Sequence, residues 1–348
     1  MRVKKSFIVL TVALLWGLFL QAQEQVNLTV DATKHYVPDW VEPTTSTAPS
    51  ARADTRLVYD AATHSTVLFG GDNGGEVPRI RYDDTWIWRN GWTQLSPATS
   101  PSARGGAGMA YDPTTGTVVL FGGNDINGNA LDDTWTWDGI TWTQQSPPLS
   151  PPARIGQTMS YDPNQRALMF GGNNGAGGLF SDTWVWNGSA RTWTQLFPAT
   201  SPVARTGAAM AYDALTKTVV LFGGSNGAGD CCNIYYGDTW TWNGTTWTQQ
   251  FPATSPSPRN VPAMAYDASL GLAILIGGYS TPGQGLSGTW AWNGTTWTEL
   301  NLADQPSARF GTAPDFDPLN DGLVLFGGEL TGDPFANDTW LLIPVPVP

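Results

Sequence analysis

The chain has little cysteine, histidine and charge, and it has no apolar run long enough to span a membrane. Two cysteines among 348 residues cannot form the disulfide framework of a small secreted domain. Charged residues make up only 13%, and the net charge of −12 argues against the basic face that nucleic-acid binding requires. Ala, Glu, Lys and Leu do not dominate the composition, so long helices and coiled coils are not expected.

Glycine, proline and tryptophan are abundant instead. The chain has 40 Gly and 26 Pro, yet 41% of its residues are apolar, which is enough to form a core. Its 18 tryptophans require a packed interior or many aromatic surfaces. The length alone is compatible with two average domains or with one large all-β domain.

The N-terminus has the organisation of an export signal. Basic residues among the first five precede an apolar run from Phe7 to Leu20, and Ala22 provides a small residue for cleavage. The run is shorter than the roughly 20 residues of a membrane span, and no cysteine follows it for lipid attachment. We therefore predict a signal peptide at 1–22, a secreted or periplasmic location, and no membrane insertion after its removal.

Six repeats organise the rest of the chain. A glycine pair follows an apolar run six times, at intervals of 52, 49, 52, 54 and 50 residues, from Gly70-Gly71 to Gly327-Gly328. An aromatic-Asp pair, a Thr-Trp pair and an arginine recur in the same phase. The arginines are Arg52, Arg104, Arg154, Arg205, Arg259 and Arg309.

Each repeat predicts four short strands, here called a to d. In the second repeat we expect them over 106–111, 117–121, 134–137 and 142–145, with turn residues between them. Four antiparallel strands per repeat, arranged radially, form a propeller blade. The sequence therefore predicts an all-β, six-bladed β-propeller with four-stranded antiparallel blades. The apolar run, the glycine pair and the two spaced aromatics resemble the kelch repeat over about residues 40–342, although Thr-Trp-x-Trp replaces that family's usual tyrosine in strand c.

The two ends of the chain predict how the ring closes. The tryptophan of strand d always precedes the next arginine by 12 residues, and Trp40 lies 12 residues before Arg52. The sixth repeat stops after Trp340 without a fourth strand. We therefore expect an N-terminal strand d to complete the last blade and remove its open edge. The predicted boundaries are a lead segment at 23–39, one propeller at 40–343 and a proline-rich tail at 344–348.

Most of the repeated residues are interpreted as structural. Tryptophans suit the interfaces where blades pack face to face, and the glycine pairs lack the strand–helix context of a phosphate loop. The arginines have two interpretations: a ring around one mouth of the channel, or an Arg–Asp pair within each blade. In the fifth blade Gly288 replaces the Asp, so that a less neutralised Arg259 would attract a carboxylate or an anionic sugar.

One face of the ring is expected to carry the ligand. The d–a and b–c loops share this face, and the two longest b–c loops belong to the opposed blades 1 and 4. The candidate binding residues are Glu76, Arg79, Arg81 and Tyr82 in blade 1, Asp230, Tyr235 and Tyr236 in blade 4, and Arg259, Asn260 and Tyr279 in blade 5. The adjacent Cys231 and Cys232 leave open a vicinal disulfide or two free thiols.

The resemblance also implies a chemistry that this chain does not support. Kelch-like propellers include copper radical oxidases resembling galactose oxidase, whose site needs histidines and tyrosines around the metal. This chain has only His35 and His64, neither of them suitably placed, so we expect no such activity, no metal and no cofactor. The segment 124–133 is either a polar loop or an incomplete calcium loop.

The favoured interpretation is an exported, noncatalytic binding module whose partner is an extracellular protein or glycan. Two alternatives stay open. One is an enzyme that acts on an extracellular carbohydrate through a pair of carboxylates, because acidic residues are plentiful. The other is a structural protein of the cell surface or envelope.

Overall fold

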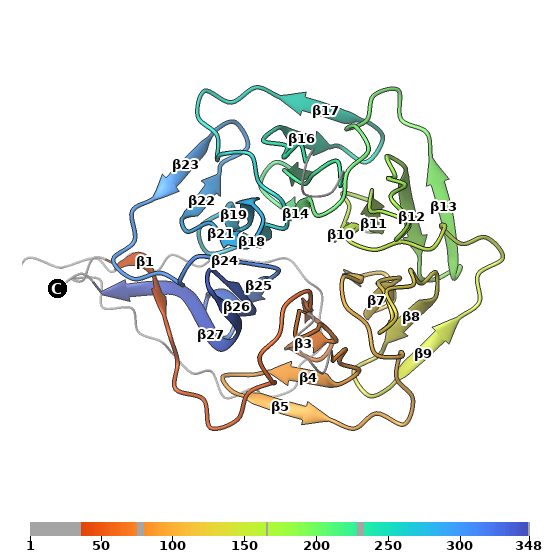
Figure 1. Cartoon of the computed structure of the whole chain (residues 1–348), viewed down its shortest axis with the longest axis horizontal. Coiled ribbons are helices and arrows are strands. Elements are labelled where there is room, and N and C mark those ends of the chain that lie inside the picture. Colours follow the sequence, from red (N-terminus) through yellow and green to blue (C-terminus); the bar gives the residue numbers. More distant parts are fainter. Residues whose placement is uncertain (1–35, 75–79, 165, 228–232, 347–348) are drawn as a thin grey trace, which may run out of the picture.

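The computed structural model describes residues 36–74, 80–164, 166–227 and 233–346. Six antiparallel blades stand around a common axis (Figure 1). The strands of the first five blades are β2 (Arg56–Asp60), β3 (Ser65–Phe69), β4 (Thr85–Trp88) and β5 (Trp92–Leu95); β6 (Gly108–Asp112), β7 (Thr117–Phe121), β8 (Thr134–Trp137) and β9 (Trp142–Gln145); β10 (Thr158–Tyr161), β11 (Ala167–Phe170), β12 (Thr183–Asn187) and β13 (Thr192–Leu196); β14 (Ala209–Asp213), β15 (Thr218–Phe222), β16 (Thr239–Trp242) and β17 (Trp247–Gln250); β18 (Ala263–Asp267), β19 (Leu272–Ile276), β22 (Thr289–Trp292) and β23 (Trp297–Leu300). The six-bladed all-β prediction is therefore confirmed.

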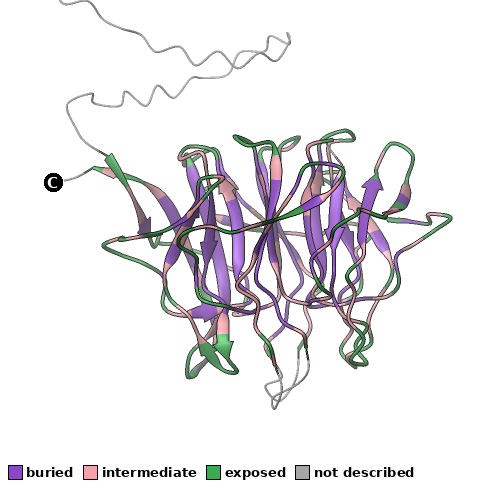
Figure 2. Ribbon diagram, turned by 90° about the horizontal axis from the view of Figure 1, so that it is seen from above, coloured by how far each residue is buried: buried purple, intermediate pink, exposed green. Residues whose placement is uncertain are grey.

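In these five blades the four strands pair in the order given, from the axis outward to β5, β9, β13, β17 and β23 at the perimeter (Figure 1). The buried strands lie between two layers of more exposed connections (Figure 2). The expected strands b, c and d of the second repeat coincide with β7, β8 and β9. Strand a begins later than expected, at Gly108, because Gly106 has a φ of 63° and donates its N–H to the neighbouring blade.

The sixth blade joins the two ends of the chain. It contains β25 (Ala313–Asp317), β26 (Gly322–Leu330), β27 (Asp333–Pro346) and β1 (Tyr36–Val41), and β24 (Arg309–Phe310) also pairs with β26. β1 is antiparallel to β27, with Trp40 opposite Leu342. The predicted closure by an N-terminal strand is confirmed, and the paired strands reach Tyr36 and Pro346, beyond the expected limits of 40 and 343. A small hairpin, β20 (Tyr279–Thr281) and β21 (Gln284–Gly285), lies in the b–c loop of blade 5.

Neighbouring blades are joined by a repeated tryptophan contact. The strand-d tryptophan donates its indole N–H to a strand-c threonine hydroxyl of the preceding blade. Five pairs are Trp92–Thr339, Trp142–Thr85, Trp193–Thr134, Trp247–Thr183 and Trp297–Thr239. Trp40 provides the sixth, to Thr289 at 2.9 Å. Because these tryptophans are buried, the structural interpretation of the strand-d set is confirmed.

The predicted signal peptide at 1–22 and most of the lead segment lie outside the described residues. Within the described ranges, no helix has the length and apolar character required to cross a membrane.

Candidate binding site around the axis

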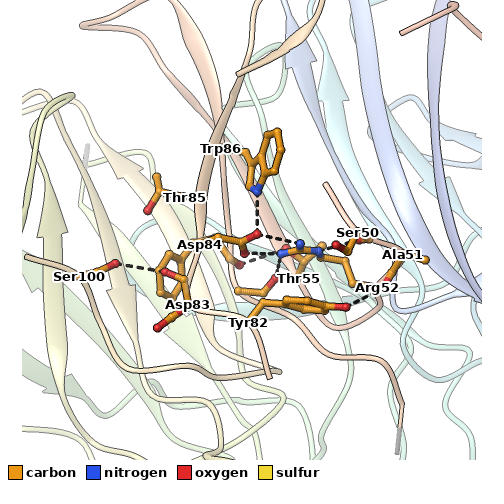
Figure 3. Close-up of polar contacts among 12 residues, drawn as sticks. Ser50, Ala51, Arg52, Thr55, Tyr82, Asp83, Asp84, Thr85, Trp86 and Ser100 are labelled. Atoms are coloured by element: carbon orange, nitrogen blue, oxygen red, sulfur yellow. Dashed lines mark hydrogen bonds and ion pairs between the residues drawn. The ribbon is translucent and has the colours of Figure 1, made fainter. Parts of the chain in front are cut away.

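The arginine that opens each repeat points into its own blade. Arg52 donates from Nη1 and Nη2 to the carboxylate of Asp84 at 2.5 and 2.9 Å, and Trp86 donates its indole N–H to that carboxylate (Figure 3). Equivalent ion pairs are Arg104–Asp133, Arg154–Asp182, Arg205–Asp238 and Arg309–Asp338. The Arg–Asp interpretation is confirmed in five blades. Since the arginines are buried, they do not ring the channel mouth.

Arg259 in the fifth blade has a different environment. Its guanidinium donates to the carbonyl of Gly277 at 2.9 Å and to the carbonyl and hydroxyl of Ser257 at 3.0 Å. At the missing Asp, Gly288 has a φ of 96°, and a Cβ there would lie 2.9 Å from Oε1 of Glu299. Burial lowers the pKa of Arg259 to about 10, and the charge of Glu299 partly opposes this shift. Arg259 is only 3% exposed, so its guanidinium does not lie on the surface.

A closed ring of six backbone hydrogen bonds surrounds the axis just before the innermost strands. In each blade, the residue two positions after the arginine has a positive φ and donates its N–H to the equivalent carbonyl of the preceding blade, at 2.8–3.3 Å. The ring residues are Asp54, Gly106, Gly156, Gly207, Val261 and Gly311. Glycine tolerates this conformation, whereas Val261, which is β-branched, is strained at a φ of 49°.

Two residues from each blade form what we call the mouth, next to this ring on the face of the d–a and b–c loops. One residue follows the arginine, the other follows the glycine pair, and the two are paired as a short β-bridge. The mouth pairs are Ala53 and Asp72, Gly105 and Asn124, Ile155 and Asn173, Thr206 and Ser225, Asn260 and Tyr279, and Phe310 and Glu329. Unlike the arginines, these residues differ from blade to blade.

Blades 4 to 6 give the mouth an aromatic side. The ring of Tyr279 lies against Tyr235 and Phe310, with centroid separations of 5.7 and 4.7 Å. Asn260 donates its side-chain amide to the hydroxyl of Tyr279 at 2.8 Å. Asn260 is only 6% exposed, and its Oδ1, like the hydroxyl of Tyr235, has no hydrogen-bond partner among the described residues. Such atoms are costly to leave unpaired, and a water molecule or a polar ligand group can satisfy them.

Blades 6 and 1 give the mouth an acidic side. Asp72 is buried and forms an ion pair with Arg81. Burial, followed by the negative charge of Asp54, raises the pKa of Glu329 above its usual value. The pKa of Tyr279 is also raised, by burial first, and the charges of Asp54 and Glu329 contribute to the shift. The negative charges of Asp54 and Glu329 are therefore close enough to influence Tyr279 on the aromatic side of the mouth.

The structure brings only part of the predicted set together. Tyr235, Asn260 and Tyr279 meet at the mouth, and Arg81 reaches it through Asp72. Tyr82 and Tyr236 instead stack on arginines inside their blades, with ring centres 3.8 Å from Cζ of Arg52 and 4.3 Å from Cζ of Arg205. Five candidates lie outside the described residues: Glu76, Arg79, Asp230, Cys231 and Cys232.

Three residues around the mouth, Asp54, Phe310 and Glu329, are missing from the sequence-based candidates. Each lies one or two positions after a repeated marker and departs from the other repeats. Asp54 stands where four repeats have glycine, and Glu329 follows the last glycine pair. Aligning the six repeats with one another and selecting the exceptions would have identified them.

The described residues offer no cluster of three or more His, Cys, Asp or Glu side chains that could hold a metal ion. His64 lies in an a–b turn and hydrogen-bonds the hydroxyl of Tyr59 at 3.2 Å. In the polar loop 124–133, the carboxylate of Asp125 accepts hydrogen bonds from Asn127 and Asn129. A hollow of about 430 Å³ at the perimeter of blade 3, along 179–183 and 195–198, contains none of the unpartnered buried polar atoms.

Comparison with known families agrees with this architecture. The sequence model of the KLHDC2/KLHL20/DRC7 Kelch-repeats domain matches residues 22–196 and 137–328. No curated protein sequence matches the chain. The two matched ranges together extend over all but the ends of the chain, and they overlap because the repeats resemble one another.

Proposed function

The chain belongs to the kelch-repeat family of β-propellers, and from this premise we propose that it is a noncatalytic module that binds a protein at the mouth. Kelch-repeat propellers are generally protein-binding modules. The observation that carries the proposal is the group of Tyr235, Tyr279, Phe310 and Asn260. It combines aromatic surface, which dominates many interface hot spots, with buried polar atoms that lack a partner among the described residues.

The chemistry of the mouth favours certain ligand groups. The ring of Tyr279 offers its face to an apolar or stacked group, and Asn260 holds that ring through its hydroxyl. The acidic side, with Asp54 and Glu329, favours neutral or cationic groups over anions. An anionic ligand would reach Arg259 only by displacing its hydrogen bonds to Ser257. We therefore expect Tyr279 and Asn260 to set selectivity, and Arg259 to act through stability.

The test is a screen of the full chain on peptide and glycan arrays, followed by titration of the strongest hit. We expect Tyr279→Leu to weaken binding about 10-fold or more, as for a central aromatic hot spot. The matched control is Leu215→Ser, an exposed apolar residue in an a–b turn of the opposite face, which should leave the affinity within about two-fold. Binding that is lost in Leu215→Ser and kept in Tyr279→Leu would place the site on the opposite face.

The array also separates the two ligand classes. A peptide hit that depends on Tyr279 supports a protein partner. A glycan hit with the same dependence moves the proposal to carbohydrate, for which aromatic stacking beside an amide is equally suitable. If no peptide or glycan hit is weakened by Tyr279→Leu, a binding role for the mouth is contradicted.

The acidic side supports a second candidate function, an enzyme acting on an extracellular carbohydrate. The pKa of the Glu329 carboxyl is raised by burial and by Asp54, as suits a general acid beside a second carboxylate. The measurement is hydrolysis of a panel of aryl glycosides. Turnover that disappears in a folded Glu329→Gln variant would support the enzyme, and no turnover on any substrate would leave the binding module.

We further propose that the protein is exported. The basic start, the apolar run from Phe7 to Leu20 and Ala22 support this proposal. Expression of the full chain in a secreting host, with N-terminal sequencing of the product, tests it. The expected mature chain starts after Ala22, and retention of the uncleaved chain inside the cell would contradict export.

A further inference from the structure

A cavity of about 100 Å³ lies on the axis, among the first residues of the innermost strands. Every blade contributes to its wall, and most of the lining residues are apolar, among them Met109, Met159, Met210 and Met264 from four consecutive blades. The chain enters each innermost strand from the hydrogen-bonded ring, so this cavity lies on the strand side of the ring, separate from the mouth.

One charged side chain lines this cavity. The first position of strand a is occupied by Arg56 in blade 1 and by small residues elsewhere: Gly108, Thr158, Ala209, Ala263 and Ala313. The five small residues leave space at the axis, and the long side chain of Arg56 lines that space. Thr158 adds a hydroxyl to the same wall.

The positive charge of the Arg56 guanidinium has few hydrogen-bond or ion-pair partners among the described residues. Its Nη1 donates to the carbonyl of Thr55 at 2.9 Å, and no described carboxylate forms an ion pair with it. Burial lowers the pKa of Arg56, and the more distant charge of Asp54 only partly opposes this shift. Asp315, an acid on a neighbouring inner strand, is held by the backbone N–H groups of Tyr59 and Phe316.

We propose that this cavity binds a small monovalent oxyanion, such as formate, nitrate or bicarbonate, on the guanidinium of Arg56. A volume of about 100 Å³ holds roughly three water molecules, which is also enough for an anion of three or four heavy atoms. The planar fork of a guanidinium matches two oxygens of such an anion. A divalent anion is disfavoured because Asp54 is near and the chain is acidic. Arg56 keeps part of its surface accessible to solvent.

The test compares thermal unfolding of the full chain in sodium formate and in sodium gluconate at equal ionic strength. Gluconate is too large for the cavity, so only formate should bind. We expect the wild-type Tm to be higher in formate by about 2–4 °C, with a saturable dependence on concentration. Arg56→Met should abolish the difference. The matched control Arg89→Met removes an exposed arginine and should keep it.

A second measurement does not depend on stability. Isothermal calorimetry with sodium formate should show one site on the wild type and none on Arg56→Met. Arg56→Lys, which keeps the charge and loses the planar fork, should bind formate at least about 10-fold more weakly. Equal Tm values of the wild type in formate and gluconate, with no calorimetric signal, would show that the cavity holds water only. An equal formate effect in wild type and Arg56→Met, or chloride binding as tightly as formate, would also overturn the proposal.

Discussion

The interiors of the blades repeat one set of side-chain contacts, whereas the side chains around the axis differ in almost every blade. Inside the blades, the same Arg–Asp pair occurs five times and the same tryptophan–threonine bond six times. Around the axis, Arg56, Val261 and Asp315 each occur once, at positions where most repeats have glycine, alanine or another small residue.

This difference separates the fold from the function. The six blade interiors are equivalent environments, so the same residues suit all of them. A residue that differs from its counterparts in the other repeats indicates an environment that occurs once, such as a binding site or a cavity. The fifth blade belongs to both regions, because Gly288 and Glu299 alter its interior while Asn260 and Tyr279 shape the mouth.

The largest expected effect tests whether the repeated interior is needed in all six copies. Deletion of residues 36–41 removes β1, the buried Trp40 and its bond to Thr289, and it leaves β27 as an open edge. We expect loss of cooperative unfolding or aggregation, measured by a thermal melt followed by near-ultraviolet circular dichroism. Val41→Thr, at an exposed position of the same strand, is the control and should melt like the wild type. A deletion variant with an unchanged melt would show that closure is dispensable.

The second prediction compares two arginines. Arg104→Met leaves Asp133 without its partner and should cost about 3–5 kcal/mol of unfolding free energy. Arg259→Met removes a buried guanidinium that has no carboxylate in ion-pair contact, so we expect less than half that cost. Urea denaturation of both variants measures the difference. Equal costs would mean that the fifth blade is energetically no different from the others.

The third prediction concerns pH. An acid at the axis and an acid inside a blade should change the stability of the protein in opposite directions as the pH rises. Burial raises the pKa of Asp315 at the axis to about 6, above its unfolded value of about 3.9. Protonation of Asp315 therefore stabilises the folded state. This stabilisation is complete below about pH 4 and is lost as the pH rises through about 6. Inside the blades, burial opposes the shift, but Arg104 still holds the pKa of Asp133 below its usual value. That contribution is present above about pH 4 and is lost on acidification.

Urea denaturation at a series of pH values tests this difference. Asp315→Asn should flatten the fall in stability between about pH 4 and 6, by up to about 3 kcal/mol over the whole window. Asp321→Asn, an exposed acid in the a–b turn of the same blade, should leave the slope unchanged. If both variants keep the wild-type slope, Asp315 does not titrate in this range.

The smallest expected effect concerns the ring of backbone hydrogen bonds. Val261→Gly relieves a β-branched residue at a φ of 49° and should stabilise the protein by about 1 kcal/mol. The reverse change, Gly207→Val, should destabilise it, because a Cβ there would lie 2.3 Å from Oδ1 of Asn260. Chemical denaturation compares the two. A marked loss of stability in Val261→Gly would mean that the packing of this valine outweighs its strain.

The blade was predictable because its signals are local. Strands b, c and d of the second repeat follow from a short apolar run and turn residues at fixed offsets, and β7, β8 and β9 match them. The start of strand a was not, since Gly106 donates its N–H to Asp54 of the preceding blade, which no signal within its own repeat reveals. Half of the site was predictable for the same reason. Asn260 and Tyr279 follow repeated markers in an unusual blade, whereas the contact between Tyr279 and Phe310 depends on the packing of blade 6 beside blade 5.

The sequence by itself determined the all-β blade, the number of blades and the strand that closes the ring, because period-two strands and turns are local and their sixfold repetition makes them unmistakable. Only the tertiary structure decided which neighbours each residue meets. Residues about one repeat apart come together when blades pack side by side, as in the hydrogen-bonded ring from Asp54 to Gly311. The environments of Oδ1 of Asn260 and of Arg56 in the axial cavity are results of that packing, because residues from several blades form them.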